Sequence, residues 1–412
     1  MSRMRVAFVV HATYPQEPRV RLQAEALAAA GHEVDVFALR ETGQAPTEEH
    51  GGIAVHRLPV ERRWPGMVGH LAEYAAFGAI ASVVLARQHA RRRYRLVQVA
   101  NPPDFLVLAA LPVKLAGVPV LLDLHEDMPM FYRDRFGEPA QRFLSGLVTV
   151  VAKASAAVAD ELLTVHEPLR ALAIERGVAP ERIGVVMNSA NEAVFDPDRA
   201  RRRVFMEDGQ LRLIHHSNLQ RMYGLDVAIA AVAELDDLRA RLDVYGDGPF
   251  RADLEAAIDR AGVGDRVRLH GAVPSQRLPQ LIADADIGLV PTRPEPYAHY
   301  SLSTKLLEYA AMGVPIIASD LATFRAHFDE HAISYVPGGD PSALAAAIRA
   351  DVGDPAATIA RGEEARRQSA AYAWSGEARR YVAIVERLAR QPARTASART
   401  ASASPADKTP QS

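Results

Sequence analysis

Residues 299–320 read HYSLSTKLLEYAAMGVPIIASD, a stretch that joins a helical pattern to a buried strand. Gly313 stands where a C-cap glycine ends a helix, and Pro315 prevents the helix from resuming. The apolar run VPIIAS that follows is typical of a buried parallel strand. Four polar residues before Gly313 fall at helical spacing and are expected to share one open helix face: Ser301, Thr304, Lys305 and Glu308.

The same alternation of helix and strand runs through both halves of the chain. Expected strands in the second half are LRLIHH, RLDVYG, RVRLHG, DIGLVP, VPIIAS and AISYVP, with helical patterns between them. The first half repeats the theme with RVAFVV, EVDVFAL, LVQVAN, VPVLLDLH and IGVVMN. This pattern predicts an α/β protein with two doubly wound Rossmann-like domains. Such a pair is expected to face a central cleft, where ligands bind at the carboxyl ends of the strands.

Composition breaks suggest where these domains begin and end. The charged, turn-rich segment 191–203 separates a first domain, residues 1–195, from a second domain, residues 204–360. Residues 361–390 are expected to form C-terminal helices, the last of them with an apolar stripe that could pack back on the first domain. Residues 391–412 are rich in Ser, Thr, Ala and Pro and are predicted to be disordered.

Bulk composition excludes several classes of protein. The 412 residues are 49% hydrophobic and 24% charged, which is ordinary for a globular protein. The net charge of -2 does not favour nucleic acid as a partner, and the lack of cysteine excludes disulfides and thiolate chemistry. The N-terminus is typical of a first strand rather than of a signal peptide, and we expect that no apolar run reaches the ~18–20 residues of a membrane span. We therefore expect a cytoplasmic protein.

Familiar nucleotide and metal motifs are absent or weak. Neither half has G-x-G-x-x-G after its first strand, and GxxxxGK[ST] is missing, which argues against a dinucleotide-dependent dehydrogenase and a P-loop enzyme. The D-x-D pair Asp284 and Asp286 could ligate a metal, but polarity at the start of a strand explains it better. His215 and His216 adjoin on a strand and point to opposite faces, so they make a poor metal pair.

Several segments taken together resemble the family 4 retaining glycosyltransferases, which have the two-domain GT-B fold. In the second half these segments are VYGDGPFRADLEAAI, DRVRLHGAV, ADADIGLVPT and STKLLEYAAMGVPIIASD. In the first half, RVRLQAEALAAAGHEVDVFAL, NPPDFL and DLHEDMP are similar to the acceptor-side domain of bacterial members. The resemblance covers almost the whole ordered chain. It implies that the first domain binds the acceptor and the second binds a nucleotide-diphosphate sugar.

The resemblance also implies roles for the helix in 299–320. Its start, at Ser303 and Thr304, would offer backbone N–H groups to the diphosphate, and Glu308 would accept the ribose hydroxyls. Both roles agree with the physics of a helix N-terminus and of a carboxylate. The alternative is a solvated helix face with a weak Lys305–Glu308 pair. The remaining donor-binding candidates are Gly246, Gly248 and Val273, although a Gly-Asp-Gly turn alone is a weak signal.

This sequence departs from the family pattern at three positions. Tyr300 stands where the family has the first of two glutamates, a carboxylate that usually lies beside the donor sugar. Asn218 and Tyr223 stand where many members carry a basic pair in the first loop of the second domain. Arg221 lies between them and is a candidate catalytic contact to the diphosphate, as is Lys305. A solvated loop arginine is the alternative for Arg221.

Candidates in the first domain follow from the resemblance alone. His125 ends the strand VPVLLDLH, where family members often have a catalytic histidine near the transferred sugar; a structural histidine is the alternative. The acceptor-side candidates are Asp104, Glu126 and Arg19.

We therefore expect a metal-independent, cofactor-free glycosyltransferase that moves a sugar from a nucleotide-diphosphate sugar to a glycan or lipid-linked acceptor. Its place would be the synthesis of cell-surface polysaccharide or another glycoconjugate. The transfer needs stabilisation of the leaving diphosphate, which preorganised donors can supply without a metal. Two alternatives remain: a sugar-nucleotide 2-epimerase of the same fold, and a non-catalytic nucleotide-sugar-binding module. No nucleic-acid partner is expected.

One apolar segment admits two readings. Residues 69–86 read GHLAEYAAFGAIASVVLA and are flanked by arginines: Arg62, Arg63, Arg87 and residues 91–93. The segment is either a core helix of the first domain with a solvated basic end, or a peripheral contact with an anionic membrane face.

Overall fold

The computed structural model describes residues 3–60, 66–130 and 138–391, without the side chains of residues 66–68 and 138–145. The chain divides into two compact units, Met187–Glu377 and a unit made of Met1–Val186 with the segment from Ala378 on. We call the unit that contains the N-terminus the first domain and the other the second domain. The chain thus enters the second domain after Val186 and leaves it at Glu377.

The first domain is built on an eight-stranded sheet in the order β3-β4-β2-β1-β5-β6-β7-β8. β3 is antiparallel to β4, and the other neighbours are parallel. The strands are β1 (Arg5–Thr13), β2 (Glu33–Leu39), β3 (Thr47–His50), β4 (Ile53–Leu58), β5 (Leu96–Ala100), β6 (Val120–Leu124), β7 (Glu161–Thr164) and β8 (Ile183–Val185). Central strands such as β5 are buried along their whole length, which fits their continuous apolar runs.

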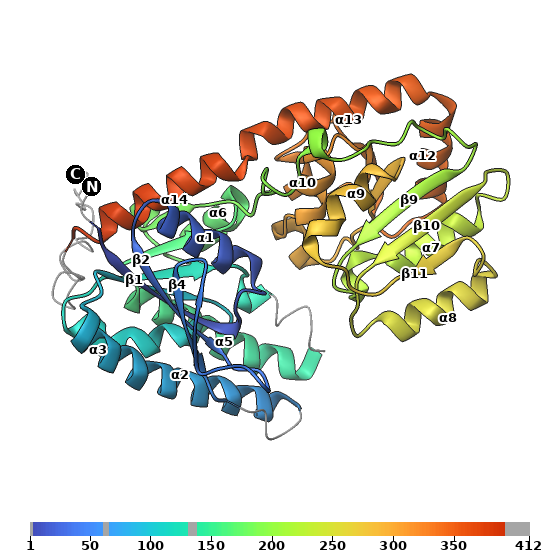
Figure 1. The fold of residues 1–412 in the computed structure, drawn as a ribbon. Helices are drawn as coiled ribbons and strands as arrows, with labels where there is room; N and C mark the ends of the chain where they lie inside the picture. The colour runs from blue at the N-terminus through green and yellow to red at the C-terminus, as the bar shows by residue number, and fades with distance from the viewer. Residues whose placement is uncertain (1–2, 61–65, 131–137, 392–412) are drawn as a thin grey trace, which may run out of the picture. The chain divides into compact units, whose positions relative to one another are not determined.

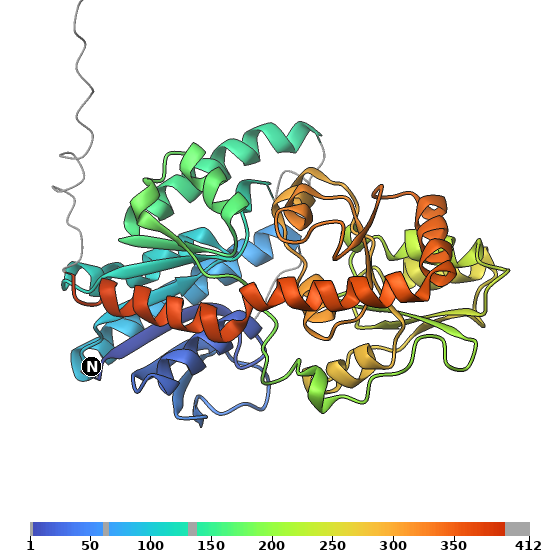
Figure 2. The same cartoon turned by 90° about the horizontal axis from the view of Figure 1, so that it is seen from above.

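Helices cover both faces of this sheet (Figures 1 and 2). One face carries α2 (Gly66–Arg92), η1 (Asp104–Ala110), α3 (Leu111–Leu115) and α5 (Glu138–Val158). The other carries α1 (Pro18–Ala29), α6 (Glu167–Glu175) and the last helix, α14 (Trp374–Leu388). A short 3-10 turn, η2 (Pro180–Arg182), leads into β8.

The second domain has a six-stranded, wholly parallel sheet in the order β11-β10-β9-β12-β13-β14. Its strands are β9 (Leu211–His216), β10 (Ala240–Tyr245), β11 (Val267–Leu269), β12 (Ile287–Val290), β13 (Ile316–Ser319) and β14 (Ser334–Val336). Its helices are α7 (Leu225–Ala233), α8 (Arg251–Ala261), α9 (Leu278–Ala283), α10 (Thr304–Ala311), α11 (Ala322–Arg325), α12 (Pro341–Gly353) and α13 (Pro355–Ser369). The 3-10 turns are η3 (Pro197–Arg199), η4 (Arg221–Tyr223), η5 (Ser275–Arg277), η6 (Pro296–Tyr300) and η7 (Ala370–Tyr372).

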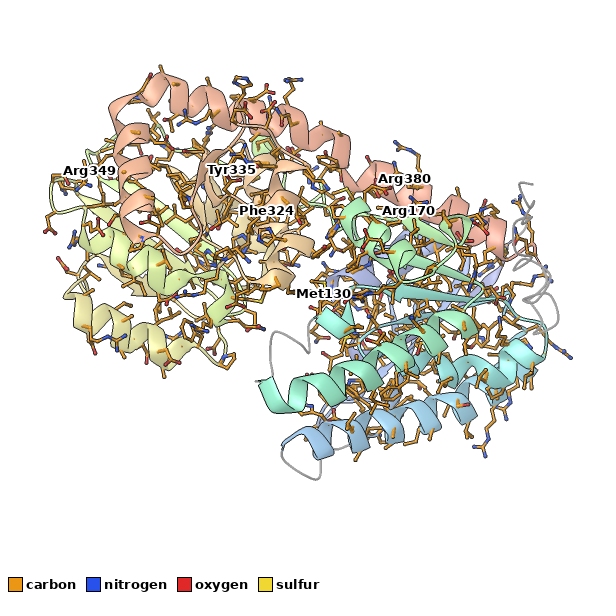
Figure 3. All side chains as sticks on the ribbon, turned by 180° about the vertical axis from the view of Figure 1, so that it is seen from behind. Met130, Arg170, Phe324, Tyr335, Arg349 and Arg380 are labelled. Atoms are coloured by element: carbon orange, nitrogen blue, oxygen red, sulfur yellow. The ribbon has the colours of Figure 1, made fainter. Side chains whose placement is uncertain are left out.

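Side chains fill the space between sheet and helices in each domain (Figure 3). Phe324 lies in the interior of the second domain and is fully buried, whereas Arg349 lies at its edge. In the first domain, Tyr381 and Val385 of α14 are fully buried. The apolar stripe of the last helix is therefore part of the first-domain core, which is why the chain returns there after completing the second domain.

Two expectations about individual elements need correction. Ser301 is not on the helix, because α10 begins at Thr304 with Ser303 as its N-cap, and Ser301 follows the 3-10 turn η6. The expectation that no segment reaches the length of a membrane span is also wrong. Within α2, Gly69–Arg92 is long and apolar enough by length and composition, because the helix continues past the apolar run to its basic end.

Candidate active site

Polar side chains gather in the second domain where β9 ends and α10 passes it. The parallel sheet places β9 between β10 and β12, so its carboxyl end lies at the middle of the sheet edge. From α10, Glu308 Oε2 lies 3.1 Å from His216 Nε2, the last residue of β9. This is the edge where ligands of doubly wound sheets bind.

Three buried polar atoms at this edge lack an aligned hydrogen bond. They are Glu308 Oε2, His216 Nε2 and Ser303 Oγ. The first two lie within ion-pair distance of each other, yet the contact is not aligned as a hydrogen bond. Because a buried polar atom without a partner is costly, such groups are normally satisfied, so these three atoms are available to a ligand that binds against α10. Ser303 is the N-cap of α10 but makes no capping bond with its side chain, so its hydroxyl is also available.

Lys305 is buried, not on an open face as its spacing suggested. Only 6% of the residue is exposed, and its Nζ lies 3.9 Å from the centre of the Tyr223 ring. Burial lowers the pKa of Lys305 to about 8, although the Glu308 carboxylate favours the charged form. The sequence placed Tyr223 where many family members have a cation. The structure places a cation from α10 over that ring, a pairing between distant segments that helical spacing cannot reveal.

His215 is held as a neutral structural residue. Its Nδ1 donates to the Leu289 carbonyl at 2.9 Å, and its Nε2 lies 2.9 Å from Ser217 Oγ. Burial, followed by the positive charge of Lys305, lowers the pKa of His215 well below its usual range. His215 thus bonds to β12 and Ser217, whereas His216 lies beside Glu308.

Arg221 lies in η4, the turn between β9 and α7, and is exposed. Within the described part of the chain it has no hydrogen bond or ion pair with another side chain, so its guanidinium is available to a ligand. Thr304, the first residue of α10, is also exposed and carries one of the unpaired N–H groups of the helix start. Val273 lies half-buried in the loop after β11.

The two glycines after β10 let its loop approach the loop after β9. Gly246 has φ +136°, and a Cβ there would lie 1.8 Å from the Ser217 carbonyl oxygen. A Cβ on Gly248 would lie 2.4 Å from the Leu219 carbonyl oxygen. Backbone packing thus requires both glycines, and they border the same edge of the sheet as Ser217.

Asp286 of the D-x-D pair is structural. Asp286 is buried and accepts hydrogen bonds from Arg203, from the Met206 amide at 2.8 Å and from the Arg212 amide at 2.7 Å. No group of three or more His, Asp or Glu residues is arranged to hold a metal ion among the side chains that the structure describes.

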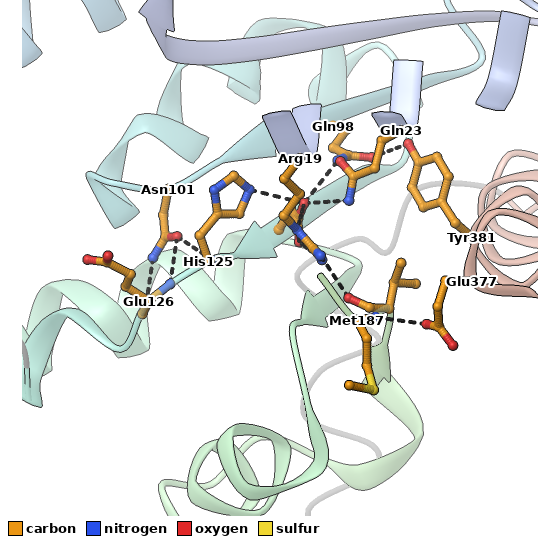
Figure 4. Close-up of polar contacts among 11 residues, drawn as sticks. Arg19, Gln23, Gln98, Asn101, His125, Glu126, Met187, Glu377 and Tyr381 are labelled. Carbon is orange, nitrogen blue, oxygen red and sulfur yellow. Dashed lines mark hydrogen bonds and ion pairs between the residues drawn. The ribbon is translucent and has the colours of Figure 1, made fainter. Parts of the chain in front are cut away.

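In the first domain, a buried network holds His125 (Figure 4). Asp123, on β6 and fully buried, is its centre: Arg19 donates to it at 2.8 Å, and His125 Nε2 lies 3.2 Å from its Oδ2. Burial opposes the charge of Asp123, but Arg19 and His125 outweigh it and hold the pKa of this carboxyl well below its usual range. The main-chain N–H of His125 donates to Asn101 Oδ1 at 2.6 Å. The histidine is therefore fixed at both ring and backbone.

The network continues to the last helix. Gln23 donates to Asp123 at 2.7 Å, Gln98 donates to Gln23 at 2.7 Å, and the Tyr381 hydroxyl donates to Gln98 at 2.6 Å. Nothing in the sequence pattern linked these residues, because each polar side chain comes from a different element. Arg19 also donates through Nη1 to the Val186 carbonyl at 2.7 Å, so it ties α1 to the end of β8 as well as to Asp123.

Asp104 and Glu126 line one cavity of the first domain, between β6 and α5, together with Asp127, Lys153 and Arg176. Burial raises the pKa of Asp104 to about 6, against the effect of a 2.8 Å hydrogen bond from Asn101. Arg176 pairs with Asp127. Leucine and alanine side chains make up much of the remaining wall, so the cavity combines an apolar lining with a few charges.

Comparison with known proteins decides the family. Residues 16–189 match the Glycosyl transferase 4-like domain, and residues 210–354 match Glycosyl transferases group 1. The chain belongs to the family 4 glycosyltransferases. This family is the one that the sequence motifs resembled, and the two parallel α/β domains confirm the expected GT-B fold.

Two similar proteins carry names of sugar-transferring enzymes. The 2-deoxystreptamine glucosyltransferase of Streptomyces kanamyceticus is 30% identical over 65% of this chain and 70% of its own. The D-inositol 3-phosphate glycosyltransferase 1 of Catenulispora acidiphila is 28% identical over 67% of this chain and 68% of its own.

Solved structures share the fold. The sucrose-phosphate synthase from Thermosynechococcus elongatus has a TM-score of 0.76 at 21% identity, covering 94% of this chain and 99% of its own. The Anabaena protein HepE, solved with UDP-glucose, has a TM-score of 0.69 at 16% identity, covering 93% and 100%. These structures show the fold, while the family models and the named relatives show that the chain is a glycosyltransferase.

Proposed function

We propose that the enzyme is a retaining glycosyltransferase whose second domain binds the nucleotide sugar at the start of α10. The observation that supports this most directly is the set of buried polar atoms without aligned partners, Glu308 Oε2, His216 Nε2 and Ser303 Oγ. A ribose supplies hydroxyl donors, which a carboxylate accepts. Phosphate oxygens suit the free N–H groups of the helix start at Ser303 and Thr304. The Anabaena relative solved with UDP and UDP-glucose supports a donor of this class.

Two cations in this domain would neutralise the leaving diphosphate. Arg221 is exposed and unengaged by described residues, and its guanidinium can bind phosphate oxygens with two parallel bonds. Lys305 is already desolvated above Tyr223, so no water need be removed from it when an anion arrives. Together they would take the part of the basic pair that is missing at Asn218 and Tyr223, which makes a metal-independent reaction possible.

The reaction would proceed on one face of the sugar. The bond between the anomeric carbon and the diphosphate oxygen breaks, and the acceptor hydroxyl attacks from the side on which the diphosphate leaves. The hydroxyl proton passes to the departing diphosphate oxygen, so charge and atoms balance without an added base. His125 is proposed to contact the transferred sugar through Nδ1, because Asp123 already engages Nε2.

The acceptor is proposed to be a glycan or a lipid-linked glycan precursor in cell-surface glycoconjugate synthesis, handled in the cytoplasm. Asp104 and Glu126 are proposed to bind it, since they line a cavity with both apolar and charged walls. Arg19 is left out of direct acceptor contact, because its donors are turned to Asp123 and Val186.

Incubating the enzyme with a panel of nucleotide sugars and candidate acceptors tests this function. We expect release of free nucleoside diphosphate that depends on the acceptor, and a product whose anomeric configuration, read by NMR, equals that of the donor. Inversion would contradict the retaining mechanism. A changed configuration at C2 of the sugar would support an epimerase instead, and binding without any turnover would support a non-catalytic module.

A further inference from the structure

Exposed apolar side chains of this enzyme collect on one face of the first domain. Seven of the nine large hydrophobic side chains that the described part of the chain exposes lie on α2, η1, α3 and α5: Leu71, Val83, Leu108, Leu111, Leu115, Leu147 and Val150. The helices α2, α3 and α5 cover the same face of the sheet (Figure 1), and η1 contacts both α2 and α5. We call their solvent side the helical face. Single exposed apolar residues are ordinary, whereas a group over adjacent elements marks an interaction surface.

The inner side of the same helices is fully used in the core. Phe77, Ala81 and Leu85 of α2 are completely buried against the sheet. The outer side of α2 presents a second apolar stripe, so the helix is apolar nearly all round. Exposed residues along it between Gly69 and Arg92 are Leu71, Ala75, Ala76, Ala79, Val83, Arg87, Ala90 and Arg91. A helix that is apolar on both sides needs a second partner beyond its own core.

Charge on the helical face has one sign. Arg87, Arg91 and Lys153 are exposed, and none of them pairs with a described acidic residue. Glu73 is the one acidic residue within Gly69–Arg92, and it is buried beside His11 at 3.3 Å. Among the described residues of α2, η1, α3 and α5, no carboxylate is exposed. An apolar area with basic residues at its margin matches the interface of an anionic bilayer.

We propose that the helical face docks the first domain on an anionic membrane surface, with the apolar side chains at the headgroup boundary and the basic ones among the phosphates. Although α2 is long enough to span a bilayer, its buried stripe belongs to the core, so the helix lies on the membrane instead of crossing it. This docking does not depend on the residues proposed for donor binding.

Co-sedimentation of the full chain with vesicles tests the proposal. We expect pelleting with phosphatidylcholine vesicles that contain phosphatidylglycerol, little pelleting with phosphatidylcholine alone, and release by high salt. The double variant Arg87→Ala/Arg91→Ala should lower the partition coefficient about fivefold for each arginine removed. The matched control Arg260→Ala/Arg268→Ala removes two exposed arginines from the second domain and should leave binding unchanged.

A second pair of variants tests the apolar part. Leu115 and Val150 are 87% and 63% exposed, so Leu115→Ser/Val150→Ser should weaken vesicle binding without destabilising the fold. Val204→Ser, at an equally exposed valine of the second domain, is the control. Equal pelleting with neutral and anionic vesicles, or none with either, would overturn the proposal. Protein that stays on the vesicles at high salt would also overturn it. The same holds if the protein does not bind vesicles and forms a dimer in solution that Leu115→Ser/Val150→Ser dissociates.

Discussion

Lys305 shows how one buried side chain can tie donor binding to pH. Its pKa is lowered from 10.5 to about 8 by burial, so the folded chain gives up this proton before the unfolded chain does. The desolvation cost is therefore fully present below the folded pKa. This cost is relieved as pH rises from about 8 towards 10.5. In that range the unfolded state binds more protons than the folded state, so the free energy of unfolding increases with pH.

The same titration predicts a fall in donor affinity at alkaline pH. If the ammonium of Lys305 binds the diphosphate, affinity should decrease by up to about tenfold per pH unit above the pKa of the free enzyme. Lys305→Arg keeps a permanent charge and should remove this dependence. Calorimetry of nucleoside diphosphate binding measures the affinity of the wild type and of Lys305→Arg. The range from about pH 7 to 10 covers both sides of the pKa of Lys305. A wild-type affinity that stays flat across the range would exclude Lys305 as a diphosphate ligand.

Arg221 is predicted to act mainly in the transition state. Negative charge on the diphosphate grows as the sugar bond breaks. Removing a guanidinium that binds this charge should therefore lower kcat by more than it raises KM. Arg221→Ala is expected to reduce kcat/KM by ~10²–10³-fold, comparable with loss of one oxyanion donor. Arg221→Lys should recover part of it, because an ammonium cannot bind bidentately.

Initial rates of nucleotide release measure this effect. Arg260→Ala, which removes another exposed arginine of the second domain, serves as the control. Turnover that Arg221→Ala leaves intact would identify Arg221 as a solvated loop residue, with the leaving group held by Lys305 and the start of α10 instead.

At the scale of elements, the approach of two loops sets the shape of the donor site. Gly246 has a left-handed φ and no room for a Cβ beside Ser217, so Gly246→Ala must move one loop away from the other. We expect both lower stability and loss of nucleotide binding. Gly264→Ala is the matched control, because its Cβ would meet its nearest neighbour at 3.8 Å. Thermal unfolding with and without nucleotide compares them; equal behaviour of the two variants would contradict the close approach.

In the first domain, we predict that stability depends on the buried network around Asp123. Asp123→Asn leaves the buried guanidinium of Arg19 without its counter-charge, and breaking a buried pair in this way costs about 3–5 kcal/mol. Tyr381→Phe removes only the outermost bond of the network and should cost about 0.5–1.5 kcal/mol. Denaturant unfolding ranks the two. If Asp123→Asn were no more destabilising than Asp253→Asn on the exposed side of α8, the network would not hold this domain together.

Helices and strands were predictable where the sequence pattern that marks them lies within the element itself. The strand LRLIHH and the helix stop at Gly313 follow from period and cap chemistry, and both are present as β9 and the end of α10. Ser301 was misplaced because helical spacing continues backwards past the N-cap, whereas the cap itself is fixed by the turn before it. Lys305 was placed outward because periodicity assigns polar residues to solvent, and only tertiary contact shows the Tyr223 ring that covers it.

At the scale of the whole molecule, the family and the fold were accessible from sequence, but the polar networks were not. Asp123, Gln23 and Tyr381 come from three distant elements, so no spacing rule could join them before the sheet order was known. The helical face was only partly visible: the sequence showed the apolar run of α2, and the structure added the outer sides of α3 and α5.

Binding of nucleoside diphosphates tests the central claim, that the second domain holds the donor through Glu308. Calorimetry should be run with UDP, GDP and ADP on the wild type, on Glu308→Ala, and on Asp253→Ala as a control that removes an exposed carboxylate from α8. We predict that at least one nucleotide binds the wild type and the control equally. Losing charge-assisted bonds to the ribose should cost Glu308→Ala about 1.5–3 kcal/mol, roughly a 10- to 100-fold rise in Kd. Unchanged affinity in Glu308→Ala, or no binding of any of the three nucleotides to the wild type, would contradict the account.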